Sequence, residues 1–382
     1  MKRLSILKRH FTSSIMAHAN SEVSNSIQNS TCFVTLTRSK KLNSLTMNMI
    51  NGLNDVFHNI VLKDKVKVLV LEGEGAKAFC AGGDVAKVRE SGLSDDKSLT
   101  YNFFHDEYLL NHIIGTQQFA DQISIWDGIT MGGGVGISVH GKYRVATEKT
   151  LFAKPETAIG FFPDVGGSYF LSKLAGSLGP FIGITGWRLN AKDLMYTGIA
   201  THYIKSDQIE ALKNELATTT VNDKSTVANI LNKFASKPGN EVAESSLLKN
   251  RDVIDKCFSH NTIEEIFNAL EMEKKNNNGN EEFATEVLNT ISPFSPAAMK
   301  QTLMLIQKGT GLPLSDCLIM EFNLCQHIVQ DTNSDFYEGV RAVLVDKDRK
   351  YDWKEGNTLE EVDLNDIEKK FNSIGDKSLV IG

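Results

Sequence analysis

The chain has 382 residues, 41% of them hydrophobic, and a formal net charge of -6. This length exceeds one ordinary core, so we expect a main domain and a sizeable second region. The acidic balance argues against nucleic acid as the main partner, and no apolar run approaches the ~20 residues of a membrane span, so we expect no membrane insertion.

The first 21 residues differ from the rest of the chain. From Met1 to Ser21 there is no Asp or Glu, while basic residues alternate with apolar and hydroxyl residues. This composition is typical of a mitochondrial transit peptide, with a disordered tail as the alternative for residues 1–21. We therefore expect the protein to be mitochondrial and located in the matrix.

A strand, a helix and a second strand are predicted next. Thr31–Thr37 is rich in β-branched residues and alternates in polarity. Thr46 is a plausible N-cap before apolar residues at helical spacing, and Val66–Gly73 is a near-continuous apolar run of strand length. The order strand, helix, strand predicts a layered α/β arrangement.

A glycine turn follows the second strand. Gly82 and Gly83 lead into Asp84 and a helical stretch from Val85. Backbone N–H groups at a helix N-terminus are unpaired and carry the positive end of the helix dipole, so Gly83 could hold an anionic oxygen. The alternative is a plain helix start capped by Asp84.

The next predicted helix carries a candidate acid. Leu99–Gly115 is rich in aromatic residues, and Glu107 adjoins its packed face, although most such acids are solvated. Gln122–Thr130 then predicts one strand that ends at the triplet Gly132–Gly134, where another helix begins.

Two acids stand beside prolines after this triplet. Short strands are predicted at Tyr143–Ala146 and Leu151–Ala153, followed by Glu156 after Pro155 and by Asp164 after Pro163. These acids are candidates for acid/base or nucleophilic work, and the alternative is a pair of loop acids that cap nearby helices. The two glycine turns could converge on one oxygen, as paired amides do in an oxyanion hole.

Helices dominate the remainder. Short helices are predicted from Ser168, Leu178 and Ala191, and a last short strand at Thr201. After Ser206 helical periodicity takes over, with helices near Gln208–Leu216, Ser225–Ala235, Ile263–Lys275, Glu281–Ile291, Pro296–Lys308 and Leu314–Val329.

Other common site motifs are missing. The chain has no GxSxG, GxxxxGK[ST] or HExxH pattern, and no GxGxxG in the dinucleotide arrangement. The five cysteines are scattered without CxxC spacing, which is typical of reduced intracellular thiols. We therefore expect no metal site and no nicotinamide site.

Several long segments resemble a known family. AFCAGGD, GITMGGGVGISVHGKYRVATEKTLFAKPETAIGFFPDVGGSYFL and DFYEGVRAVLVDKDRKYDWK look like the 3-hydroxyisobutyryl-CoA hydrolases of the crotonase (enoyl-CoA hydratase/isomerase) superfamily, from about Thr31 to Lys354. The resemblance implies the α/β class, with a crotonase (ClpP-like) ββα spiral core that holds the active site at residues 30–205 and a mostly α-helical C-terminal region at residues 206–382.

The resemblance also implies a substrate and a site. The substrate would be an acyl-CoA thioester, typically the 3-hydroxyisobutyryl-CoA of valine breakdown, so coenzyme A is part of the substrate and no cofactor is expected. The oxyanion donors would be the N–H groups of Gly83 and Gly133, and the catalytic carboxylates Glu156 and Asp164. Glu107 would bind the substrate's polar end, with Gly133, Glu156 and Asp164 as further substrate contacts, and a homo-oligomer is a further expectation.

One position separates a hydrolase from a hydratase. The related hydratases place their first catalytic glutamate in the pattern GGGxE, and that position is Gly136 here. This predicts thioester hydrolysis, in which Glu156 attacks the carbonyl to give an anhydride or activates water, and Asp164 assists. The alternatives are an enoyl-CoA hydratase or isomerase that uses Glu156 alone, and a non-catalytic acyl-CoA-binding subunit.

Overall fold

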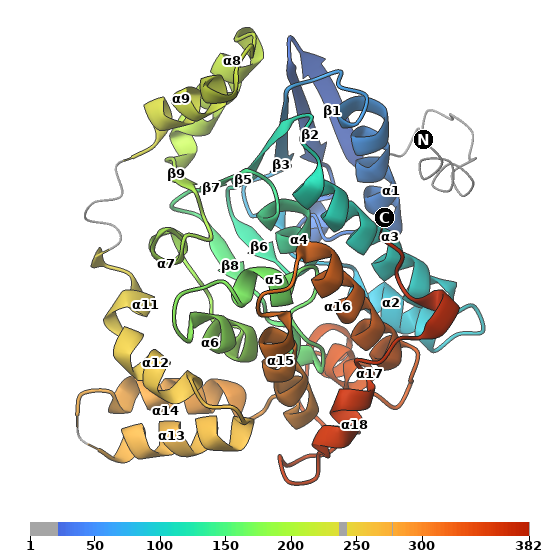
Figure 1. The fold of residues 1–382 in the computed structure, drawn as a ribbon, viewed down its shortest axis with the longest axis vertical. Helices are drawn as coiled ribbons and strands as arrows, with labels where there is room; N and C mark the ends of the chain where they lie inside the picture. Colours follow the sequence, from blue (N-terminus) through green and yellow to red (C-terminus); the bar gives the residue numbers. More distant parts are fainter. Residues whose placement is uncertain (1–21, 237–242, 277, 382) are drawn as a thin grey trace.

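The computed structural model describes residues 22–236, 243–276 and 278–381 (Figure 1). The transit peptide expected at residues 1–21 lies outside these residues. The first described strand is β1, Val23–Gln28, which pairs antiparallel with β2, Thr31–Leu36. The strand predicted as first is therefore the second, because five of the six residues of β1 are exposed and give it no apolar alternation.

Within the described residues, a six-stranded sheet has the order β1-β2-β3-β5-β7-β9, and every pair after β1-β2 is parallel. Its inner strands are almost entirely buried, as expected for parallel strands covered on two sides. The bounds of the strands after β2 are β3, Val68–Gly73; β5, Asp121–Trp126; β7, Tyr143–Ala146; and the edge strand β9, His202–Tyr203.

A second, smaller sheet of parallel strands completes the core. It contains β4, Ala78–Cys80; β6, Ile129–Met131; and β8, Leu151–Ala153. Two strands of the larger sheet are each followed by a strand of the smaller sheet and then by a helix: β3, β4 and α2 (Val85–Gly92), then β5, β6 and α4 (Gly133–Val139). This repeat confirms the predicted ββα spiral.

The strand predicted over Gln122–Thr130 is wrong in one respect. The chain leaves the larger sheet after Trp126 and enters the smaller one at Ile129. Gly128 makes this turn with φ +124, and a Cβ on it would lie 2.6 Å from the Lys77 carbonyl oxygen. An alternating pattern does not reveal a change of sheet, and only the glycine indicated a turn.

The helices of the core begin close to where the sequence predicts. α1, Met47–Val56, starts after Thr46, whose Oγ1 accepts the N–H of Met49 at 3.1 Å. The aromatic helix is α3, Ser98–Thr116. Three further helices of this part are α5, Gly167–Leu171; α6, Leu178–Thr185; and α7, Ala191–Thr197.

After Ser206 the described chain contains helices and no strand. Figure 1 places α8 and α9 beside the larger sheet, where their apolar residues pack with the sheet residues Val70 and Ile123. The remaining helices lie below the sheets in this view. The bounds are α8, Ile209–Thr218; α9, Lys224–Phe234; α11, Ser246–Lys249; α12, Arg251–Phe258; α13, Ile263–Lys275; α14, Glu281–Ile291; α15, Pro296–Gly309; α16, Leu314–Val329; α17, Asp335–Val340; and α18, Leu364–Lys369.

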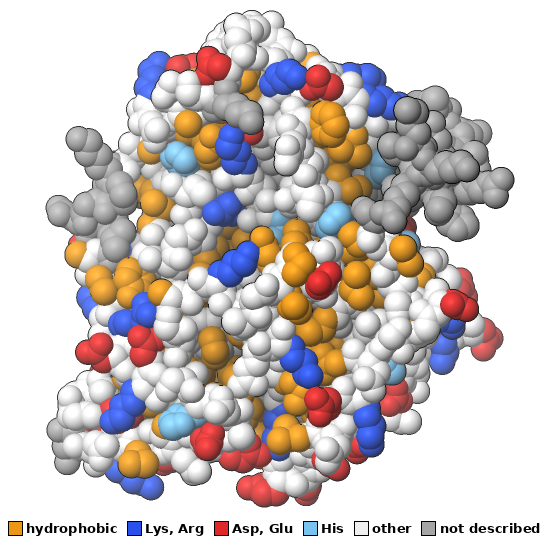
Figure 2. Space-filling model, viewed as in Figure 1, with side chains coloured by type: hydrophobic (Ala, Val, Ile, Leu, Met, Phe, Trp, Pro, Cys, Tyr) orange, Lys and Arg blue, Asp and Glu red, His pale blue; other side chains and the backbone are white. Residues whose placement is uncertain are grey.

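One long helix joins the two parts of the chain. α16 packs along α3 of the core, and the side chain of Gln326 donates to the Thr100 carbonyl at 3.2 Å. Figure 2 shows basic and acidic side chains interspersed over the visible face. None of the described helices is long and apolar enough to cross a membrane.

Candidate active site

The two glycine turns meet in space. Gly82 and Gly132 both have positive φ, +100 and +50. A Cβ on Gly82 would lie 3.9 Å from the nitrogen of Gly133, so the turns are in van der Waals contact. Neither the N–H of Gly83 nor that of Gly133 donates to another described residue. Two free backbone donors therefore stand side by side, as an oxyanion hole requires.

Asp84 does not cap the helix that follows Gly83. No side-chain bond caps α2, and Asp84 Oδ2 instead pairs with Arg38 Nη2 at 2.9 Å. The plain capped-helix interpretation of this turn is therefore wrong, and the Gly83 N–H stays available.

Glu156 begins a 3-10 helix, Glu156–Ile159, three residues after the end of β8, and is 6% exposed. Its Oε1 lies 2.8 Å from Lys154 Nζ, and its Oε2 accepts no hydrogen bond from another described residue. A Cβ on Gly132 would lie 3.5 Å from Glu156 Oε1, so this carboxylate adjoins the paired glycine turns. Burial raises the pKa of Glu156 to about 7, although the charge of Lys154 opposes the shift.

Asp164 is held by two donors. Its Oδ2 accepts the hydroxyl of Tyr108 at 3.1 Å, and its Oδ1 lies 3.3 Å from Lys154 Nζ. Burial raises the pKa of Asp164, while Lys154 and Tyr108 lower it. Glu156 thus keeps an unpartnered oxygen, whereas both oxygens of Asp164 are engaged.

The turn after Asp164 is strained and firmly held. Val165 has φ +54, a genuine outlier for a β-branched residue that costs on the order of 1–3 kcal/mol. Its carbonyl oxygen lies 2.8 Å from His140 Nε2. The next N–H groups, of Gly166 and Ser168, donate to the buried carboxylate of Glu321 in α16 at 2.7 and 2.8 Å.

Glu107 lies in α3, and its side chain, which is 2% exposed, stands beside Gly133. A Cβ on Gly133 would collide with Glu107 Oε1, so a side chain at position 133 would require the Glu107 carboxyl group to move. That oxygen has no hydrogen-bond partner among the described residues. Burial, and next the charge of Asp164, raise the pKa of Glu107 well above its ordinary value.

All five residues proposed from the sequence line one cavity of about 920 Å³. The aromatic rings of Phe103, Phe104 and Phe161 line it as well, and so do the exposed arginines Arg188 and Arg349. The structure therefore brings together Gly83, Glu107, Gly133, Glu156 and Asp164. Among the described residues no group of three His, Cys, Asp or Glu could hold a metal ion.

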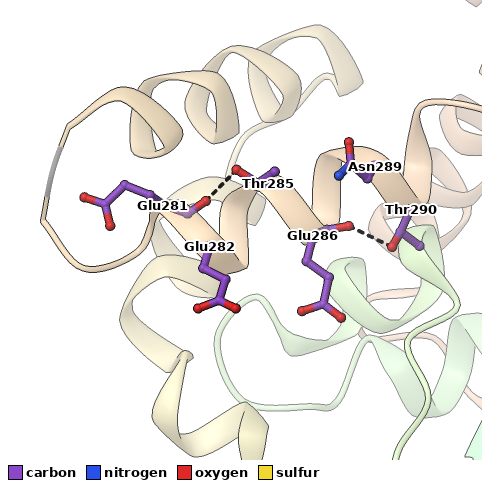
Figure 3. Close-up of a pocket in the computed structure, with 6 residues that line it drawn as sticks. All are labelled: Glu281, Glu282, Thr285, Glu286, Asn289 and Thr290. Carbon is purple, nitrogen blue, oxygen red and sulfur yellow. Dashed lines mark hydrogen bonds between the residues drawn. The ribbon is translucent and has the colours of Figure 1, made fainter.

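A shallow depression along α14 is a weaker candidate (Figure 3). One helix supplies all of its lining residues, which include Glu281, Glu282 and Glu286. The hydroxyl groups of Thr285 and Thr290 donate to backbone carbonyls of the same helix at 2.6 and 2.8 Å. No second element encloses a ligand there, so we assign it no site.

The space beside Gly136, the position at which the related hydratases carry their first catalytic glutamate, is filled by the side chain of Val165. A Cβ on Gly136 would lie 2.5 Å from Val165 Cβ and 3.1 Å from Asn111 Nδ2. A glutamate at this position would therefore displace Val165 and with it the turn that carries Asp164. The side chain of Val165 therefore occupies the space that a glutamate at position 136 would need.

Sequence reasoning missed three residues of this arrangement. Lys154 stands two positions before Glu156, but the chain turns at Pro155 and a 3-10 helix begins at Glu156, so strand alternation gives no signal for their contact. Tyr108 is one of several aromatic residues in the predicted helix Leu99–Gly115, and nothing in the sequence distinguishes it from the others. Glu321 carries no local signal, because it lies 153 residues from Ser168 in the chain.

Comparisons with known proteins agree on the family. The family model described as enoyl-CoA hydratase/isomerase matches residues 31–371. A Xenopus laevis protein named "3-hydroxyisobutyryl-CoA hydrolase, mitochondrial" is 42% identical, over 91% of this chain and 87% of its own length. The Homo sapiens protein of that name is 39% identical, over 99% and 95%. "3-hydroxyisobutyryl-CoA hydrolase 1" of Arabidopsis thaliana is 40% identical, over 89% of each chain.

Two solved structures share nearly the whole fold. A carnitinyl-CoA dehydratase from Mycobacterium thermoresistibile superposes with a TM-score of 0.84 at 32% identity, covering 94% of this chain and 99% of that one. An enoyl-CoA hydratase from Rhodobacter sphaeroides 2.4.1 gives 0.83 at 28% identity, covering 94% and 100%. The crotonase-type fold expected from the sequence is confirmed.

Proposed function

The chain belongs to the enoyl-CoA hydratase/isomerase family, and from this premise we propose that it hydrolyses an acyl-CoA thioester, with 3-hydroxyisobutyryl-CoA as substrate. Relatives about 40% identical over most of the chain carry the name of that hydrolase. The observation that carries the proposal is the unpartnered Oε2 of Glu156 beside two free glycine N–H groups. The products are the free hydroxy acid and the thiol of coenzyme A.

Each residue of the site would have its own role in thioester hydrolysis. The thioester carbonyl oxygen accepts the N–H groups of Gly83 and Gly133, which stabilise the negative charge that develops when the carbonyl is attacked. Glu156 supplies the attacking or proton-accepting oxygen through Oε2. Asp164, held by Tyr108 and Lys154, orients water or receives its proton.

Two routes use this geometry. In the first, Glu156 attacks the carbonyl and forms an anhydride that water then cleaves. In the second, Glu156 removes a proton from a water molecule that attacks the acyl carbon. A single turnover in H₂¹⁸O with 3-hydroxyisobutyryl-CoA identifies the anhydride if ¹⁸O appears in Glu156, because only water attack on the Glu156 carboxyl carbon of an anhydride places it there. Label in the product acid alone arises from either route, and borohydride then separates them, since it reduces an anhydride of Glu156 but leaves a free carboxylate unchanged.

Several features support coenzyme A as part of the substrate. Arg188 and Arg349 line the cavity and are exposed, where they could neutralise phosphate groups. The cavity of about 920 Å³ has room for a ligand of more than acyl size. Because backbone N–H groups stabilise the oxyanion, the proposed reaction needs no cofactor, and treatment with EDTA should leave thiol release unchanged.

A hydratase is the second candidate, because the two solved structures of similar fold carry the titles dehydratase and hydratase. The assay that separates the candidates follows free thiol with 3-hydroxyisobutyryl-CoA and double-bond loss with crotonyl-CoA. Thiol release from the first substrate without double-bond loss in the second supports the hydrolase. Double-bond loss without thiol release would refute it, and inertness towards both would favour a non-catalytic acyl-CoA-binding subunit.

Location and assembly complete the proposal. The Xenopus laevis and Homo sapiens relatives are named mitochondrial. We propose that residues 1–21 direct this chain to the mitochondrial matrix, which fusion of this segment to a fluorescent protein would test. We also propose a homo-oligomer, for which light scattering gives the mass.

A further inference from the structure

Lys154 is a fully buried lysine at the end of β8, with 0% exposure. Its Nζ lies 2.8 Å from Glu156 Oε1, 3.3 Å from Asp164 Oδ1 and 3.1 Å from the Asp164 carbonyl oxygen. An ammonium group has three N–H donors and no acceptor. Two of these donors are hydrogen-bonded to Asp164, and the contact with Glu156 Oε1 is an ion pair.

A buried ammonium is costly, and an apolar side chain of the same volume would often serve stability as well or better. The position of this charge therefore calls for a reason other than packing. Lys154 touches both carboxylates assigned to the reaction, and no other described lysine or arginine is paired with either of them. It also links the strand end to the turn of Asp164, ten residues further on.

We propose that Lys154 is a positioning residue of the reaction, whose ammonium holds Glu156 and Asp164 together, keeps them ionised and leaves Glu156 Oε2 free for the chemistry. The proposal rests on the proposed function, because it assigns Lys154 a role through these two residues. Lys154 itself does not touch the substrate.

The physical reason is the repulsion of like charges. Two neighbouring buried carboxylates without a shared cation cannot both ionise readily, and one of them takes up a proton. A proton on Glu156 would remove the oxygen lone pair that attacks the carbonyl or accepts the proton of water. With the ammonium in place, both carboxylates lose their protons at lower pH.

Other ionisable groups also act on this cluster. The carboxyl groups of Glu107 in α3 and Glu321 in α16 also face the two carboxylates, and burial raises the pKa of both. Burial keeps the pKa of His140, which packs behind the turn, low at about 4, so this histidine is neutral at the pH of the assay. The raised pKa of Tyr108 likewise keeps its hydroxyl protonated. Lys154 is thus the one cation among the described groups that face the two carboxylates.

The experiment compares the pH dependence of kcat/KM in the wild type and in Lys154→Met. The acid limb of this profile is the low-pH range in which kcat/KM rises as the carboxyl groups lose their protons. An opposite charge at this distance lowers a carboxyl pKa by about 1–3 units, so its loss should shift the acid limb to higher pH by at least about one unit. Lys154→Arg, which keeps the charge, should keep the limb within about half a unit of the wild type. Should the methionine variant fail to fold, Lys154→Gln tests the same loss of charge.

Lys300 provides a matched control. It is also a buried lysine, 5% exposed, and pairs with Glu264 at 2.7 Å, but it does not line the cavity. Lys300→Met should lower the melting temperature without moving the acid limb. An acid limb that stays in place in Lys154→Met, with loss of melting temperature alone, would overturn the proposal and leave Lys154 a purely structural residue.

A second readout does not depend on activity. In ¹³C-carboxyl NMR titrations, the variants Glu156→Gln and Asp164→Asn assign the signals of the two carboxyl groups. The pKa values of Glu156 and Asp164 should both be higher in Lys154→Met than in the wild type. Unchanged values would refute the role of Lys154. If the wild-type chain released no thiol from any acyl-CoA, the proposed function would fail, and the titration would still decide whether Lys154 controls the two carboxylates.

Discussion

The packing of Gly136 against Val165 yields a prediction that can be worked from the structure. In Gly136→Ala the new methyl group would lie 2.5 Å from Val165 Cβ and 2.8 Å from Val165 Cγ2, against about 3.5–4 Å for an ordinary contact. Val165 cannot easily move, because its carbonyl oxygen is bonded to His140. Overpacking of this kind costs typically 1–3 kcal/mol, so we expect Gly136→Ala to lower the free energy of unfolding by about 2 kcal/mol.

A second substitution tests the cause. Val165→Gly removes both colliding atoms and adopts φ +54 without strain, so the double variant should be more stable than the sum of the single effects by at least ~1 kcal/mol. Urea unfolding measures the four free energies. Because Val165 adjoins Asp164, kcat/KM for thiol release should fall at least ~10-fold in Gly136→Ala. Additive free energies together with unchanged kcat/KM would refute the reasoning.

Three further predictions concern the acids of the site. Burial raises the pKa of Glu156 to about 7, and the ionised carboxylate is the form that attacks the carbonyl or activates water. We therefore expect kcat/KM to rise with pH through an apparent pKa near 7. A value of kcat/KM that is independent of pH between about 5.5 and 8 would contradict this. Tyr108→Phe removes a donor that favours ionised Asp164. The free energy of unfolding should therefore fall by about 2 kcal/mol at pH 8 and by less at pH 5, and an equal loss at both would count against the bond to the charged form. Burial raises the pKa of Glu107 and so favours its neutral form, which glutamine resembles; Glu107→Gln should therefore change KM less than about threefold, whereas Glu107→Ala should raise it about tenfold or more.

Much of the fold could be predicted from local sequence patterns. Thr46 was recognisable as an N-cap, and its hydroxyl caps α1. The bounds of α13, α14 and α16 agree with the predicted ranges, because their apolar residues recur at helical spacing. β1 was missed, since a strand exposed on nearly every residue has no such pattern. The short strand β4 was missed as well, because three residues show no period.

The site was predictable in its members but not in its connections. Glycine turns and proline-flanked acids are local features, and the resemblance to a family assigned them roles. The ion pair of Lys154 with Glu156 has no periodic signal, because the chain turns at Pro155 between them. The contact of Glu321 with Gly166 joins segments far apart in the chain, and only the packing of α16 brings them together.

Thiol release by Glu156→Gln tests the central claim most directly. Glu286, an exposed glutamate that lines the same cavity from α14, provides the matched control Glu286→Gln. With 3-hydroxyisobutyryl-CoA at pH 8, Glu156→Gln should remain folded and release coenzyme A at least ~100-fold more slowly than the wild type, and Glu286→Gln within about twofold of the wild type. Near-normal thiol release by Glu156→Gln would contradict the account.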